Sequence, residues 1–313
     1  MSQSLENEKS AKKSLKHTKA YKLPKLKKLK KRTIKRLVFA VVVLALVGLL
    51  VFAEIIHPNR EAVAYNGRIE KASAPLQTCF QKVADSTQQD LFYSADVDIK
   101  VKQDDVKDIQ TVVAECRTAM QTFRKTVDSL LSLPLSGYTK EYRHAQLTQQ
   151  HAENVLSQSN DILNQYNAMA DFLSQYYAHL SNFLAAYDSL EASEQNYTIS
   201  NRNQFLSKLG SSMHTEAAAL RALKAPVGFT QVRDSAATMT DQLANGFDNL
   251  AKGFDSYSDY YKSQGYQQVD AAIKTYDKSV IGQPFPVIHD SYLVDQVNSL
   301  PSKVENILAA ESE

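Results

Sequence analysis

The sequence predicts an all-α protein, with one N-terminal transmembrane helix followed by an elongated extracytoplasmic helical bundle that packs with coiled-coil-like heptads. Three observations support this fold class. Residues 37–53 form an uncharged apolar run, apolar residues after position 57 recur every three or four positions, and only nine glycines and eight prolines occur among 313 residues. Long runs of three-and-four spacing are typical of helices that cross at shallow angles.

Charge and hydropathy divide the chain into three parts. We expect a largely disordered basic cytoplasmic tail at 1–36, a transmembrane signal-anchor helix at 37–56, and an extracytoplasmic helical domain at 57–313, with a further division into sub-bundles at 57–135 and 138–313 left open. The tail holds 14 Lys and Arg residues against two Glu, a net charge of +12. The remainder holds 22 basic and 32 acidic residues, a net charge of −10, so the whole-chain value of +2 hides a strongly polarised molecule.

The second half of the tail favours contact with lipid. From Pro24 onward, leucines follow one another at helical spacing among lysines and arginines, which is typical of a basic amphipathic helix on the inner membrane surface. The candidate contacts to anionic inner-leaflet lipids are Lys25, Lys27, Lys28, Lys30, Lys31, Arg32, Lys35 and Arg36. Two alternatives stay open, a plain topology signal and nucleic-acid binding through the same charges. We rank nucleic acid below lipid because Tyr21 is the only aromatic residue among these cations.

The apolar run Leu37–Ala53 is long enough to cross a bilayer. Its 17 residues reach about 26 Å as a helix, and with Ile55 and Ile56 it covers a hydrocarbon core of about 30 Å. Basic residues beside a span stay on the cytoplasmic side, so we expect a single-pass protein of the cytoplasmic (plasma) membrane with its N-terminus inside. The alternative is a signal peptide cleaved after Val51-Phe52-Ala53, but the basic region and the apolar run are both longer than usual.

The first two helices of the domain each carry a cysteine on an apolar stripe. One helix is expected from about Arg60, with Pro75 as a break just before Cys79. An extended connector at 97–102 follows, and a second helix begins after Asp104-Asp105 and includes Cys116. Two cysteines alone in an oxidising compartment most simply form a disulfide, which would stabilise the domain by about 3–4 kcal/mol.

The later helices show the longest heptad patterns. They are expected at 138–194, 201–224, 230–262 with a continuation past Gly265 to 280, and 293–307. Gly246 and Gly253 lie seven residues apart and would let a neighbouring helix approach closely, which offsets their low helix propensity. Gly265 is expected to bend or interrupt its helix.

The sequence gives only weak evidence for a catalytic or metal-binding site. Two Glu-x-x-His spacings occur, Glu54 with His57 and Glu141 with His144, but neither has an inward carboxylate partner of the kind that di-metal bundles use. His144 and His151 lie seven apart without a matching pair, and His179 is expected on a helix surface or boundary. No nucleophile elbow, zinc-protease motif or phosphate-binding glycine loop is present. We therefore predict no catalytic residues, no metal and no cofactor.

A group of tyrosines is the one candidate recognition surface that the sequence suggests. Tyr257, Tyr260, Tyr261 and Tyr266 cluster near Gly265, and tyrosine is favoured where proteins bind one another; core packing and scattered exposure are the competing explanation. We expect a non-enzymatic membrane-anchored module that binds or spaces another cell-envelope component. Its expected partner is a protein of the cell envelope, and homo-oligomerisation is left open. The alternatives are a sensory or ligand-binding ectodomain that acts through a partner subunit and, third, an envelope enzyme.

Overall fold

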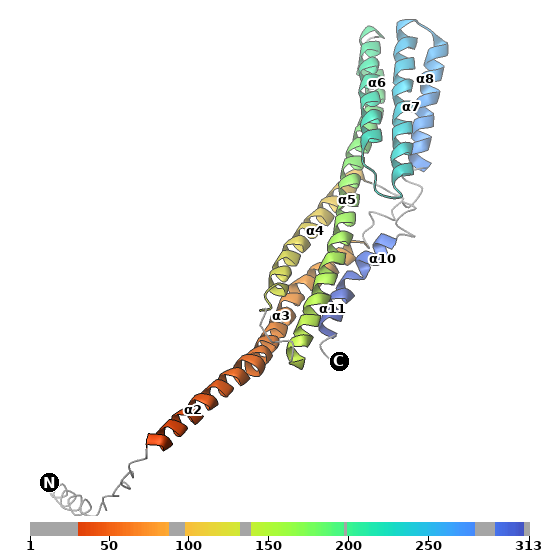
Figure 1. Cartoon of the computed structure of the whole chain (residues 1–313). Coiled ribbons are helices and arrows are strands. Elements are labelled where there is room, and N and C mark those ends of the chain that lie inside the picture. The colour runs from red at the N-terminus through yellow and green to blue at the C-terminus, as the bar shows by residue number, and fades with distance from the viewer. Residues whose placement is uncertain (1–30, 88–97, 132–138, 197–198, 279–291, 310–313) are drawn as a thin grey trace, which may run out of the picture. The chain divides into compact units, whose positions relative to one another are not determined.

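The computed structural model describes residues 31–87, 98–131, 139–196, 199–278 and 292–309 (Figure 1). Within these ranges the regular secondary structure is helical and no strand is found. This confirms the predicted all-α class. The chain divides into two compact units, Met1–Ile56 and His57–Glu313.

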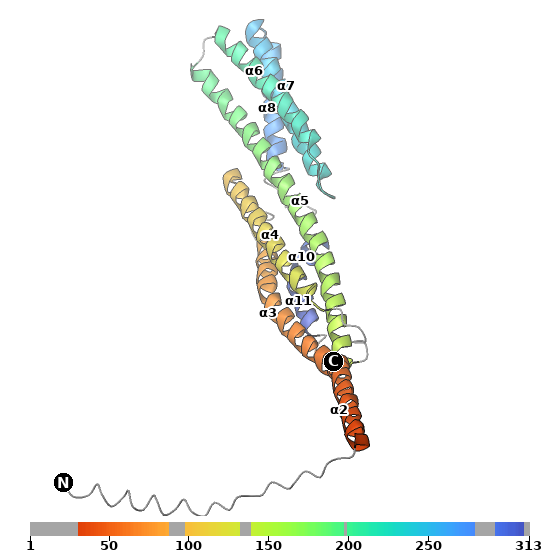
Figure 2. The same ribbon diagram turned by 60° about the vertical axis from the view of Figure 1, so that its left-hand side comes forward.

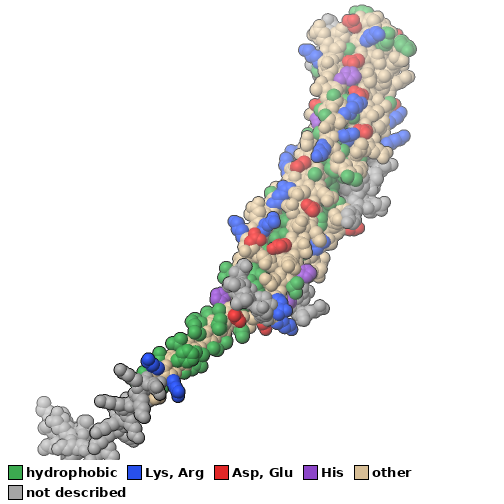
Figure 3. All heavy atoms as spheres, in the orientation of Figure 1, with side chains coloured by type: hydrophobic (Ala, Val, Ile, Leu, Met, Phe, Trp, Pro, Cys, Tyr) green, Lys and Arg blue, Asp and Glu red, His purple; other side chains and the backbone are tan. Residues whose placement is uncertain are grey.

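The first unit contains the apolar helix. Helix α2 (Lys31–Val51) is followed by a π-helical turn, η2 (Phe52–Ile56). Among the described residues this is the one place where a helix is long and apolar enough to cross a membrane, and none of the apolar stretch is buried inside protein. Figure 3 shows its hydrophobic side chains on the surface, with Leu44 and Phe39 each 71% exposed. Such a surface matches a hydrocarbon environment rather than water.

The second unit is built on one very long helix. Its elements are α3 (His57–Ser86), α4 (Ile99–Val127), α5 (Lys140–Asn196), α6 (Ile199–Ala222), α7 (Thr230–Asp255), α8 (Asp259–Tyr276), α10 (Tyr292–Asn298) and α11 (Leu300–Ala309). Helix α5 has 57 residues and is therefore about 85 Å long. One part of it packs against α3, α4, α10 and α11, and it also contacts α6 and α7. Helix α5 thus joins two groups of helices.

The group formed by α6, α7 and α8 carries the candidate site. Helix α6 packs along α7, and α7 packs along α8, as Figures 1 and 2 show from two directions. The α7–α8 contact is close because glycines face each other there. A Cβ added to Gly246 would lie 3.1 Å from the Gly265 carbonyl oxygen, and one added to Gly265 would lie 2.8 Å from the Gly246 carbonyl oxygen. The predicted close approach at Gly246 is confirmed.

Three predicted helix limits were wrong. Helix α3 runs unbroken through Pro75, whose ring is on the exposed face while Leu76 and Phe80 are buried beside it. Helix α4 begins at Ile99, inside the expected connector, because the Asp98 side chain accepts a hydrogen bond from the Lys100 backbone N–H and caps the helix.

The third correction concerns the end of α7. It ends at Asp255 instead of continuing past Lys262, and Gly265 lies inside α8 without interrupting it. The chain therefore turns between residues 256 and 258, at the first tyrosine of the predicted cluster. This turn brings the tyrosines to one end of the α7–α8 pair.

Candidate functional site

The four predicted tyrosines lie together at the α7–α8 turn. Tyr257 is in the turn, Tyr260 and Tyr261 are in the first turn of α8, and Tyr266 follows farther along the same helix. Tyr257 is 75% exposed, Tyr260 64% and Tyr266 40%, whereas Tyr261 is half-buried. We call residues 254–261 with Tyr266 the aromatic turn. Three of its four tyrosines are therefore exposed on the surface of the helical unit.

The backbone of the aromatic turn holds Tyr257 in an unusual conformation. Its φ of 54° lies in the left-handed region, and it is the only non-glycine residue with a positive φ in the described part of the chain. The turn closes through backbone hydrogen bonds from Ser256 N–H to the Lys252 carbonyl at 2.9 Å and from Ser258 N–H to the Gly253 carbonyl at 3.0 Å. Glycine normally occupies such a helix-ending position, and a side chain there costs about 1–2 kcal/mol.

Gly253 makes the tight turn sterically possible. A Cβ at this position would lie 2.8 Å from the Lys262 backbone nitrogen and 3.2 Å from the Ser258 carbonyl oxygen. Because both atoms belong to the backbone, they cannot move aside as a flexible side chain would. Helices α7 and α8 therefore come closest to the turn at Gly253, where a larger side chain would not fit.

Cations from three helices lie over the rings. Lys252 Nζ is 3.8 Å from the centroid of the Tyr261 ring, and the Arg202 guanidinium of α6 is 4.2 Å from the centroid of Phe254. Lys262 Nζ lies 5.3 Å from the same Phe254 centroid. Cation–π contacts contribute about 0.5–1 kcal/mol at exposed sites. The rings are therefore held in place by neighbours instead of rotating freely.

Polar contacts further order the aromatic turn. The Gln264 side-chain amide donates to the Tyr260 hydroxyl at 2.8 Å, and the Tyr260 and Tyr261 rings pack edge to face with centroids 5.4 Å apart. On the α6 side, the Asn203 amide donates to the Asp255 carboxylate at 2.9 Å. Helix α6 thus supports the turn, although the sequence cluster contained no α6 residue.

The predicted disulfide residues come together in the core of the unit. Cys79 of α3 and Cys116 of α4 are 7% and 0% exposed, and their Cα atoms lie 5.4 Å apart, which is a disulfide distance. Both lie on the buried stripes that the sequence pattern assigned to them. The pair joins two helices at neighbouring positions of the α3–α4 contact.

Four of the eight predicted lipid-contact cations lie in α2. Lys25, Lys27, Lys28 and Lys30 lie outside the described residues, and Lys31 and Arg32 begin α2. Lys35 and Arg36 are exposed on α2, just before the apolar stretch. Contact of these residues with anionic lipid stays a prediction.

The histidines considered from the sequence have different surroundings. His151 is exposed and His144 is half-buried. His179 is partly buried and contacts Glu216 of α6, with Nδ1 and Oε2 2.5 Å apart. In the described parts of the chain, no group of three or more His, Cys, Asp or Glu side chains is positioned to hold a metal ion.

Buried tyrosines in the core are packing groups. Burial raises the pKa of Tyr65, Tyr176, Tyr177 and Tyr276 above the ordinary value of 10.0 and raises the pKa of Tyr166 to about 12. These rings differ from those of the aromatic turn in being buried in the helical core. The Tyr65 hydroxyl donates to the Val127 carbonyl at 3.1 Å, a bond that joins α3 to the end of α4.

Several contacts of the site were not predicted from the sequence. Arg202 of α6 and Lys252 of α7 contact rings of the aromatic turn, and only their spatial packing reveals them. Comparison of the chain with protein-family models, with curated proteins and with solved structures finds no match. The function must therefore be inferred from the chain's own residues.

Proposed function

We propose that this chain is a non-enzymatic, membrane-tethered helical module whose aromatic turn binds a protein component of the cell envelope. The observation that carries the proposal is Tyr257, a large side chain that is 75% exposed on a backbone conformation that glycine would adopt at lower cost. Strained backbone persists where the surrounding structure enforces it and is concentrated at functional sites. We infer that Tyr257 keeps its exposed ring, despite this backbone cost, because the ring contacts a partner protein.

The arrangement of the rings suits a protein partner. Tyrosine offers a large, rigid contact area with a polar tip and has few rotatable bonds to immobilise. Lys252 and Arg202 already hold neighbouring rings of the turn in place, so less side-chain freedom is lost on binding. A partner with apolar side chains and hydrogen-bond acceptors would complement this surface.

The proposed location rests on the apolar helix and on the charges before it. Lys35 and Arg36 directly precede the apolar stretch of α2, and a strongly basic segment next to a span is retained on the cytoplasmic side. The helical unit would then stand outside the cytoplasmic membrane. Helix α5 is about 85 Å long, and it would act as a spacer within the helical unit that carries the aromatic turn.

Site-specific photo-crosslinking tests the proposal. The photoreactive residue p-benzoylphenylalanine is introduced in place of Tyr257 or Tyr260 in the full chain, and native membranes are irradiated before purification and mass spectrometry. The matched control places the same residue at Val101, which is 53% exposed on α4. We expect one protein to be captured reproducibly from both tyrosine positions and not from Val101.

Two outcomes would contradict the proposal. One is capture of the same proteins from all three positions, which would indicate nonspecific proximity in the membrane. The other is the absence of any protein adduct at Tyr257 and Tyr260 when the full chain is expressed at its native level and is intact.

A further inference from the structure

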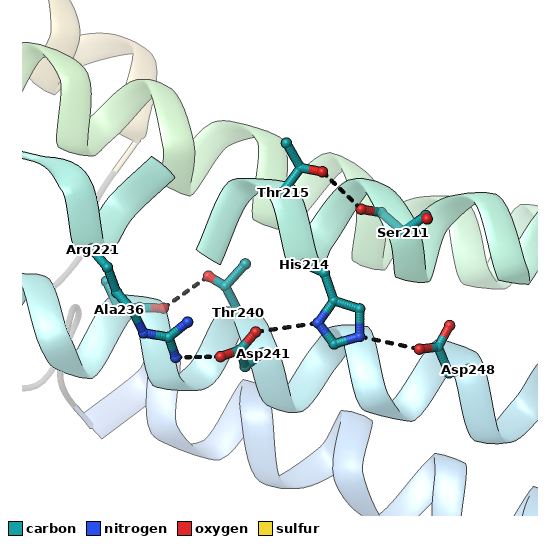
Figure 4. A network of polar contacts seen from close by, with 8 residues as sticks. All are labelled: Ser211, His214, Thr215, Arg221, Ala236, Thr240, Asp241 and Asp248. Atoms are coloured by element: carbon teal, nitrogen blue, oxygen red, sulfur yellow. Dashed lines mark hydrogen bonds and ion pairs between the residues drawn. The ribbon is translucent and has the colours of Figure 1, made fainter. Parts of the chain in front are cut away.

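A histidine on α6 lies between two carboxylates of α7. His214 Nδ1 is 3.3 Å from Asp241 Oδ1, and its Nε2 is 3.1 Å from Asp248 Oδ2 (Figure 4). The two aspartates are seven residues apart, which is about two helical turns, so they lie on one face of α7. The imidazole ring bridges that interval from the neighbouring helix. Both of its nitrogens therefore face carboxylate oxygens.

This geometry distinguishes between the protonation states of the ring. A neutral imidazole has one N–H donor and one nitrogen lone pair, whereas the imidazolium ion has two N–H donors. With the neutral ring, one nitrogen lone pair would face a carboxylate oxygen across about 3 Å. We propose that His214 is a proton-dependent clip that fastens α6 to α7, closed when the ring carries its second proton.

The surrounding groups support this arrangement. Arg221 of α6 donates to Asp241 Oδ2 and leaves Oδ1 to the histidine. With the ring protonated, His214 and Arg221 together balance the charges of Asp241 and Asp248. With the ring neutral, the same four side chains carry one unbalanced negative charge.

The backbone of α6 leaves room for one of the carboxylates. Gly210 lies one turn before His214, and a Cβ at this position would overlap the Asp248 carboxylate. The glycine therefore lets Asp248 lie against α6 and reach the ring. Neighbouring hydroxyls do not compete, because Thr215 donates to the Ser211 carbonyl and Thr240 donates to the Ala236 carbonyl within their own helices.

The other face of α6 has a different kind of histidine contact. Glu216 accepts from Asn182 at 3.1 Å and contacts His179 of α5 through one ring nitrogen only. A neutral His179 tautomer with its proton on Nδ1 satisfies that contact. His179 can therefore make its hydrogen bond with one ring proton, whereas His214 needs both ring protons to donate to both of its carboxylates.

The direction of the pH effect follows from the linkage between protonation and folding. The folded state places an acceptor at each ring nitrogen, and the unfolded chain offers neither, so the clip stabilises the fold when the ring carries both protons. The clip therefore contributes to stability at mildly acidic pH, and its contribution is lost at higher pH once the ring has released its second proton. It also falls at strongly acidic pH, where the aspartates become protonated.

Thermal unfolding of the full chain in detergent micelles at pH 5.5 and pH 8 tests the clip. We expect the difference between the two midpoints to be smaller by about 2–4 °C in His214→Gln than in the wild type. His151→Gln is the matched control, because His151 is exposed on α5. It should keep the wild-type pH response.

A double-mutant cycle separates the clip from general packing. His214→Gln, Asp248→Asn and the double variant are compared at both pH values, and the coupling between the two positions is calculated from their unfolding midpoints. We expect coupling at pH 5.5 and its loss at pH 8. Equal coupling at both pH values, or an unchanged pH response in His214→Gln, would overturn the proposal.

Discussion

Tyr257 follows the end of α7. Its φ is 54°, and three-quarters of its side chain is exposed. Its contribution to stability and its contribution to binding are therefore expected to have opposite signs. We predict that Tyr257→Gly stabilises the protein by about 1 kcal/mol, because glycine adopts the left-handed region without a Cβ penalty. The same change should abolish capture of the partner by a crosslinker placed at Tyr260.

The comparison variant for this prediction is Tyr257→Asn. Asparagine tolerates the left-handed region better than tyrosine but also lacks the aromatic ring, so it should keep part of the stability gain and lose binding. Thermal unfolding and the Tyr260 crosslink measure the two effects in one set of samples. A loss of stability in both variants would mean that the Tyr257 ring is a packing group, and the binding role would then be wrong.

For individual residues, the sequence predicted which tyrosines lie close together but not which side chains contact them. Their spacing along the chain was visible, whereas Arg202 comes from a helix more than fifty residues earlier. The pair Asp241 and Asp248 shows the same limit. Their seven-residue spacing places them on one helix face, but His214 enters only through the packing of α6 on α7.

The elements show where local sequence signals decide structure and where packing overrides them. Heptad spacing predicted α5 to within two residues at each end. Pro75 and Gly265 predicted interruptions that do not occur. Leu76 next to Pro75 is buried in the core, and Gly265 is itself buried against Gly246 and Leu250 of α7. The true break after Asp255 has no glycine in its left-handed position. Tyr257 occupies that position, so the usual sequence signal for a helix end was absent.

Replacing Gly265 by alanine tests whether helix propensity or close packing decides stability at the α7–α8 contact. In a free helix, glycine to alanine gains about 1 kcal/mol in propensity. A Cβ at Gly265 would lie 2.8 Å from the Gly246 carbonyl oxygen and 2.9 Å from the Leu250 backbone nitrogen, so it would force the helices apart. We predict that Gly265→Ala destabilises the protein by about 1–3 kcal/mol, measured by urea unfolding of the full chain in micelles.

The matched control for Gly265 is Gly67→Ala on α3. A Cβ at Gly67 has no neighbouring heavy atom within 4 Å, so only the propensity term should operate. This variant is expected to be more stable than the wild type by about 0.5–1 kcal/mol. If both alanine variants are stabilised, the close α7–α8 contact does not constrain the fold.

The two units of the chain expose different kinds of surface. The unit ending at Ile56 exposes apolar side chains along α2, whereas the unit from His57 onward buries an apolar core and carries Lys, Arg, Asp and Glu over the face seen in Figure 3. The first surface is favourable in hydrocarbon and the second in water. This contrast supports anchoring of the chain in a membrane, but only the charges beside the apolar stretch favour one orientation.

Thiol chemistry tests that orientation through the cysteine pair. If the helical unit faces an oxidising compartment, Cys79 and Cys116 should be bonded to each other in cells. We predict no maleimide adducts on the native chain when cells are denatured with maleimide and no reductant, and two adducts after reduction, measured by intact mass. Two adducts without reductant would mean that the pair is reduced and that the unit does not face such a compartment.

Introduced cysteines locate the two sides directly and complete the orientation test. Ser263→Cys places a thiol on the exposed face of α8, and Ser14→Cys places one in the basic tail. With a membrane-impermeant maleimide on intact cells, we expect labelling of the Ser263→Cys variant and none of the Ser14→Cys variant. A permeant maleimide should label both, which controls for reactivity. The reverse impermeant pattern would put the aromatic turn in the cytoplasm, where an envelope partner could not reach it.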